Sequence, residues 1–91
     1  MTDYQFEWDP AKDKANQRKH GIPFQIAAQV FDDPLHLSEM DRIESGEYRW
    51  QTIGRVNDTT LLLVAHTYLD DDQNTVVRGV LKKSRRLENS V

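Results

Sequence analysis

Three residues in the second half of the chain have side chains suited to phosphate chemistry: Arg49, His66 and Arg78. A guanidinium group can donate two parallel hydrogen bonds to phosphate oxygens. A neutral imidazole can accept a proton near pH 7. If the fold brings these groups together, they could hold a phosphate and activate a nucleophile beside it.

The stretch 48–69 should position two of these residues. It predicts two strands around a two-residue turn at Asn57-Asp58, because both residue types tolerate the positive φ of such turns. This turn sets a register in which Arg49 faces His66. The apolar residues of the two strands then share the other face, which we expect to be the core: Tyr48, Trp50, Val56, Leu61, Leu63 and Ala65.

A further strand expected at 75–81 adds Arg78. We expect it opposite His66, because a shift of one residue would bury an unpaired cation. Flanked by two arginines, His66 should have a lowered pKa, since like charges disfavour its protonated form. The alternative is an ordinary strand histidine, with Arg49 paired to a nearby acid such as Glu47.

The order of the elements predicts an α+β fold. Two N-terminal helices should pack on one face of a mostly antiparallel sheet of four or five strands. Asp9 should cap the first helix and Gly21 should end it. Besides the strands above, the expected elements are a strand at 4–8, helices at 10–20 and 24–31, a strand at 35–40, a polar loop at 42–46 and a basic tail at about 82–91.

Length and composition limit the possible classes. Its 91 residues predict one domain spanning 1–91, and the absence of cysteine excludes disulfides and thiolate metal sites. The three histidines lack metal-ligand spacing, so we expect neither a metal nor another cofactor. No apolar run of about 18 residues and no signal peptide pattern occurs, which favours a cytoplasmic protein without a membrane span.

The charge distribution is more informative than the net charge of −3. Cations cluster at residues 12–19 and 78–86, and most acids lie between these clusters. If both clusters reach one side of the fold, they create a local field that attracts phosphate. The alternative is that each cluster is simply a solvated surface.

Several segments between residues 5 and 78 form a recognisable pattern. They are Phe6-Glu7-Trp8-Asp9-Pro10-Ala11-Lys12, Asn16, Lys19-His20-Gly21-Ile22, Phe24, Ala27, Val30-Phe31-Asp32-Asp33-Pro34, Glu47-Tyr48-Arg49, Ile53-Gly54-Arg55 and Leu62-Leu63-Val64-Ala65-His66-Thr67. This pattern resembles the BrnT toxins of type II toxin–antitoxin systems. The resemblance implies a RelE-like fold and a ribonuclease that arrests translation.

The resemblance also implies partners and site residues. A BrnA-like antitoxin should neutralise the toxin, RNA should be the substrate, and operator DNA should be contacted only through the antitoxin. We expect an acidic antitoxin segment to dock on the basic surface. Positions matching the family are Lys19, His20, Arg49, Arg55, His66 and Arg78. We expect catalysis, independent of metal, from Arg49, His66 and Arg78, and RNA binding from Lys19, Arg55, Lys82, Lys83, Arg85 and Arg86.

The C-terminus departs from the family pattern. BrnT chains usually continue with a Ser-Ala-Arg-like segment and a basic helix containing a tyrosine, whereas this sequence keeps cations without that tyrosine. An alternative is therefore a weakened homologue that only binds the antitoxin. A third possibility is a small nucleic-acid-binding regulator, although the negative net charge counts against it.

Overall fold

The computed structural model describes residues 4–71 and 74–87. Within these residues the elements are β1 (Tyr4–Glu7), α1 (Pro10–His20), α2 (Phe24–Ala27), the 3₁₀ helix η1 (Ala28–Asp32), β2 (Leu37–Glu44), β3 (Glu47–Val56), β4 (Thr60–Asp71) and β5 (Asn74–Arg86). The predicted α+β class is confirmed. None of the helices in this part is long and apolar enough to cross a membrane.

The strands of the described part form one five-stranded sheet in the order β1-β5-β4-β3-β2. The neighbours β2 to β5 pair antiparallel, whereas β1 pairs parallel with β5. The expectation of a mostly antiparallel sheet is therefore only partly right, because the sheet is mixed. Tight turns connect β2 to β3 and β3 to β4, which forces antiparallel pairing. β1 is joined to β5 through the rest of the fold, so no turn fixes its direction.

α1 begins and ends where its sequence predicts. The carboxylate of Asp9 accepts hydrogen bonds from the backbone N–H groups of Ala11 and Lys12, at 2.9 and 3.5 Å. Pro10 occupies the first turn, and Gly21 ends the helix with a φ of 71°. The local signals at both ends of α1 therefore agree with the fold.

Polar contacts hold α1 against the rest of the molecule, since its own side chains are exposed or half-buried. The carboxylate of Asp13 accepts a hydrogen bond from the backbone N–H of Phe24 at 2.8 Å. The Nδ1 atom of His20 lies 3.0 Å from the hydroxyl of Ser84 in β5. These contacts connect α1 to α2 and to the sheet.

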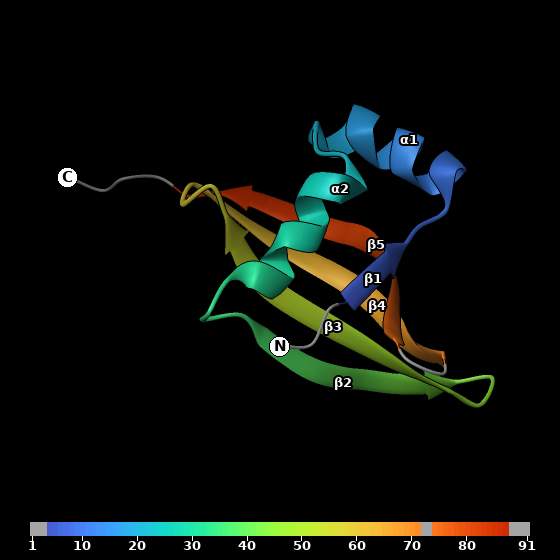
Figure 1. The fold of residues 1–91 in the computed structure, drawn as a ribbon. Coiled ribbons are helices and arrows are strands. Elements are labelled where there is room, and N and C mark those ends of the chain that lie inside the picture. The colour runs from blue at the N-terminus through green and yellow to red at the C-terminus, as the bar shows by residue number, and fades with distance from the viewer. Residues whose placement is uncertain (1–3, 72–73, 88–91) are drawn as a thin grey trace.

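The second helical segment crosses one face of the sheet (Figure 1). We expected a continuous helix over 24–31, but only α2 is α-helical, and η1 continues as a 3₁₀ helix. This segment approaches the sheet at two glycines. A Cβ atom at Gly54 would lie 2.8 Å from the backbone oxygen of Val30, and one at Gly79 would lie 2.9 Å from the Phe24 ring. The missing side chains therefore allow the close packing of this segment.

The turn between β3 and β4 is longer than expected by one residue. Asn57 and Asp58 have the expected positive φ values, 54° and 58°, but Val56 pairs with Thr60 and not with Thr59. This shift reverses the faces of β4 relative to the prediction. The core below α2 and η1 contains Leu62 and Val64 in place of the expected Leu61, Leu63 and Ala65.

We call the face that α2 and η1 cover the helix face. The opposite face, which carries Leu61, Leu63 and Ala65, is the open face.

β2 and β5 extend beyond their expected ends. β2 continues through most of the expected loop at 42–46, and Ser45-Gly46 forms the turn with positive φ values of 51° and 79°. β5 includes residues 82–86, which we expected to begin a basic tail. These residues pair with the start of β4, so backbone pairing outweighs their polar composition. The remainder of the expected tail, 88–91, lies outside the described residues.

Candidate nucleic-acid interface

The open face gathers basic side chains from adjacent strands. Arg55 in β3 and Arg85 in β5 lie on either side of Leu61 in β4. Two pairs further along β4, Lys83 lies beside Leu63. Their side chains share the face of their strand partners, because directly opposite residues point to the same side. Cations therefore flank an apolar strip in the middle of this face.

Two further arginines lie on the same face, towards the other end of the sheet. Arg78 in β5 pairs with Thr67 in β4 and with Glu7 in β1. Arg49 in β3 shares the face of Arg55, since the two positions differ by an even number of residues. In the described part, the basic residues on the open faces of β3 and β5 are Arg49, Arg55, Arg78, Lys83 and Arg85.

Arg49 and Arg78 line one cleft of about 880 Å³. The wall between them includes Thr67, which is buried, and Lys12 contributes from α1. The side chains of the two arginines are 42% and 62% exposed, so a ligand can reach both. Two guanidinium groups beside one cleft form a suitable site for a phosphate group.

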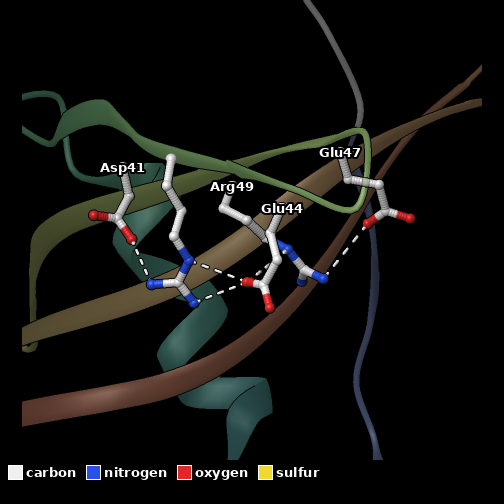
Figure 2. Close-up of polar contacts among 5 residues, drawn as sticks. Asp41, Glu44, Glu47 and Arg49 are labelled. Carbon is white, nitrogen blue, oxygen red and sulfur yellow. Dashed lines mark hydrogen bonds and ion pairs between the residues drawn. The ribbon is translucent and has the colours of Figure 1, made fainter.

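Carboxylates hold Arg49 in the absence of a ligand. Figure 2 shows the guanidinium between Glu44 and Glu47, at nitrogen–oxygen distances of 3.9 and 3.7 Å. Glu44 also pairs with Arg42 at 3.0 Å, and Arg42 contacts Asp41 at 3.2 Å. All these groups are at least a third exposed, so each ion pair is weak. A phosphate can therefore compete with these carboxylates for Arg49.

Arg78 has a carboxylate partner from the neighbouring strand. Its Nε and one terminal nitrogen donate hydrogen bonds to the same oxygen of Glu7, at 3.2 and 3.0 Å. Glu7 and Glu47 both line the cleft. Each arginine thus has a carboxylate beside it that could exchange a proton with a bound substrate.

The expected row of Arg49, His66 and Arg78 is wrong. His66 pairs with Trp50 and Gly79, so its side chain lies on the helix face and not in a row with the two arginines, although His66 is also among the residues that line their cleft. Thr67 occupies the predicted place opposite Arg78. Two shifts of one residue cause this: the longer turn between β3 and β4 pairs Trp50 with His66, and Leu69 in β4 pairs with Val76 in place of the expected Thr75.

His66 is part of the core, with 3% of its surface exposed. Its ring lies 5.0 Å from that of Phe31 and 4.9 Å from that of Tyr68. Its Nε2 atom lies 2.6 Å from the hydroxyl of Thr52, which lies 2.6 Å from that of Ser38. Its Nδ1 atom finds no hydrogen-bond partner among the described residues.

Burial lowers the pKa of His66 to about 4. The expected direction of this shift is confirmed, but its expected cause, two neighbouring cations, is wrong. Removal from water disfavours the charged imidazolium. His66 is therefore neutral near pH 7, and its Nε2 atom joins a hydrogen-bond chain that reaches the exposed Ser38 through Thr52.

The other predicted RNA-binding residues divide between the two sides of the sheet. Arg55, Lys83 and Arg85 belong to the open face, as described above. Arg86 pairs with Thr60, which places it on the helix face, and Lys19 lies in the last turn of α1. Lys82 is the extra residue where the pairing of β5 with β4 shifts. Only part of the expected basic set therefore gathers on one surface.

Sequence reasoning did not single out Glu7, Thr67 or Lys12 as individual members of a site. The parallel pairing of β1 with β5 places Glu7 beside Arg78, although 71 positions separate them in the chain. No local pattern signals such a contact. Glu47 appeared only as a possible partner of Arg49, and that ion pair is confirmed.

Comparison with known proteins identifies the family. The family described as the ribonuclease toxin BrnT of type II toxin–antitoxin systems matches residues 8–80. A comparison with curated proteins gives no match. The matched region begins directly after β1 and ends at Val80 in β5, so it includes Arg49 and Arg78 but not Glu7. The chain therefore belongs to the BrnT family of ribonuclease toxins, whose place in a toxin–antitoxin system implies an antitoxin partner.

Proposed function

We propose that this chain is a toxin that cleaves RNA in the cytoplasm without a metal ion and so inhibits translation. One observation carries this proposal: Arg49 and Arg78 line the same exposed cleft, each beside a carboxylate. Guanidinium groups stabilise the charge that develops on phosphate oxygens, and a carboxylate can take a proton from a hydroxyl.

In the proposed reaction, the 2′-hydroxyl of a nucleotide attacks the adjacent phosphorus. Glu47 or Glu7 accepts the proton of this hydroxyl while Arg49 and Arg78 bind the non-bridging oxygens. The bond from phosphorus to the 5′-oxygen then breaks, and that oxygen takes up a proton. The products are a 2′,3′-cyclic phosphate and a 5′-hydroxyl. His66 is not a catalytic group in this reaction, because its side chain is buried on the helix face.

The rest of the open face would bind the RNA backbone. Arg55, Lys83 and Arg85 attract phosphates through charge, largely without regard to sequence. The apolar strip that contains Leu61 and Leu63 offers a surface for unstacked bases. Single-stranded RNA is therefore the substrate class that this face fits best.

The experiment uses purified protein, a labelled single-stranded RNA and an excess of chelator. We expect cleavage that leaves cyclic phosphate ends, and we expect no cut at a nucleotide whose 2′-hydroxyl is replaced by hydrogen. The variants Glu47→Gln and Glu7→Gln identify the proton acceptor, since the correct one should lower the rate without weakening RNA binding. Products with 5′-phosphate ends, or activity that requires a metal, would refute the mechanism.

A second candidate function is an antitoxin-binding module without catalysis. The carboxylates on both arginines favour it, because they compete with phosphate for these groups. Production of the chain alone in a bacterium separates the two functions. Growth arrest that co-production of the antitoxin relieves would support the enzyme, and normal growth with intact, folded protein would support the binding module.

A further inference from the structure

The two long hairpins of the sheet separate at one end. The ladder between β3 and β4 runs from Val56–Thr60 to Trp50–His66. β3 begins three residues before this last pair, at Glu47, and β4 continues to Asp71. The turn between β2 and β3 lies at the same end of the sheet as the end of β4 (Figure 1). Beyond Trp50 and His66, the β2–β3 hairpin and the β4–β5 hairpin therefore form two arms with a gap between them.

Apolar and aromatic side chains line this gap. A pocket of about 570 Å³ lies there, and we call it the aromatic fork, defined by Met40, Tyr48, Trp50, Tyr68 and Leu69. The rings of Trp50 and Tyr68 meet edge to face, with centroids 5.7 Å apart. Met40 is 51% exposed and Tyr48 57%. Exposed aromatic side chains grouped around a pocket are typical of protein-binding sites.

The charges beside the fork select among possible partners. Residues 37–49, which form β2 and the start of β3, contain four acids and two arginines: Glu39, Asp41, Glu44, Glu47, Arg42 and Arg49. The arginines pair with three of these acids, and an excess of negative charge remains beside the fork. This negative charge repels a second copy of the same surface, because like charges would meet across a symmetric contact. A partner with basic side chains complements it.

We propose that the aromatic fork is the docking site of the antitoxin. The docking segment would place an apolar or aromatic side chain between Tyr48 and Tyr68 and would carry lysine or arginine beside it. This position differs from the basic surface that the sequence suggested. The proposal of this docking site rests on the membership of the chain in a toxin family and not on the cleavage reaction proposed above.

The position of the fork explains how such a partner could neutralise the toxin. Glu47 and Thr67 line both the aromatic fork and the cleft that contains Arg49. A segment seated in the fork therefore lies against a wall of the candidate RNA site. It would block that site from its edge, without placing acids on the arginines.

The test measures binding of the separately purified cognate antitoxin by calorimetry. Tyr48→Glu and Met40→Glu each add a charge at an exposed position on the arm formed by β2 and β3, so both variants should fold. Leu35→Glu is the matched control, since Leu35 is 84% exposed and lies outside the fork. Circular dichroism checks folding, and RNA cleavage by each free variant checks that the cleft is intact.

We expect each fork variant to bind the antitoxin at least about 30-fold more weakly than the parent, as for a central interface residue. Leu35→Glu should bind like the parent. Unchanged binding by both fork variants would overturn the proposal, as would an equal loss in Leu35→Glu. A dimer of the free chain that Tyr48→Glu dissociates, with antitoxin binding intact, would also overturn it. Calorimetry gives these answers whether or not the chain cuts RNA.

Discussion

His66 should make the stability of this protein depend on pH between 7 and 5. Its folded-state pKa is about 4, whereas the ordinary value is 6.5. The unfolded chain therefore binds a proton at a pH where the folded chain does not. The contribution of neutral His66 to the free energy of unfolding is fully present above pH 6.5 and is lost as the pH falls towards 4.

The size of this effect follows from the two pKa values. At pH 5 the unfolded imidazole is almost fully protonated and the folded one mostly neutral. The difference should lower the free energy of unfolding by about 2 kcal/mol between pH 7 and pH 5. For a small domain, this is a large fraction of the total stability.

The variant His66→Gln isolates this contribution. Glutamine does not titrate, and its amide can reach the position of Nε2 and keep the hydrogen bond with the Thr52 hydroxyl. Urea unfolding of both proteins at pH 7 and pH 5 gives the two free-energy losses. The parent should lose about 2 kcal/mol more than the variant over this range. Carboxylates titrate equally in both proteins, so their contribution cancels.

Equal losses of unfolding free energy in the parent and in His66→Gln between pH 7 and pH 5 would refute this reasoning, since they would mean that His66 is not buried in a neutral form. The same variant separates a core histidine from a catalytic one. Folded His66→Gln should still cleave RNA at a rate close to that of the parent. A loss of activity of 100-fold or more, with stability retained, would restore His66 to the catalytic set.

Two further predictions concern packing and capping. Gly54→Ala should lower the free energy of unfolding by about 1–3 kcal/mol, because its Cβ would meet the Val30 backbone at 2.8 Å; chemical denaturation measures the loss, and a neutral effect would contradict the close contact. Asp9→Ala should lower stability by about 1 kcal/mol, since two backbone N–H groups of α1 lose their acceptor; Asp9→Ser should recover most of it, and an unchanged melting temperature in Asp9→Ala would rule out the cap.

The parts of the fold that local chemistry determines could be predicted. The cap at Asp9 and the stop at Gly21 bound α1 as expected, because these residue types satisfy or release backbone groups within one turn. The class of fold followed from the order of the elements. The apolar spacing of 24–31 also predicted a buried helical segment, although its second half is a 3₁₀ helix.

The composition of the site depended on one residue of register in each of two hairpins, β3–β4 and β4–β5. Asn57 and Asp58 favour positive φ in turns of different lengths, so they did not distinguish pairing of Val56 with Thr59 from pairing with Thr60. β4 is apolar on both faces from 61 to 65, and therefore neither register exposed an obvious mismatch. Alternating polar and apolar residues would have fixed the choice.

Contacts between distant segments could not be predicted from the sequence, for a different reason. Glu7 meets Arg78 only because β1 adds to the sheet beside β5, and nothing near either residue indicates this pairing. The cation clusters at the two ends of the chain led us to expect one shared basic surface. The structure, however, brings mainly the cations of β3 and β5 to the open face.

The central claim is that Arg49 and Arg78 act together in one cleft on the open face. The most direct measurement is the rate of RNA cleavage, with a chelator present, by the parent and by Arg49→Ala, Arg78→Ala and Arg86→Ala. The first two variants should each be slower by about 100-fold or more, because each loses a group that stabilises the transition state. Arg86→Ala, an arginine on the helix face, should cleave at nearly the parental rate. Equal rates in all four proteins would contradict the claim.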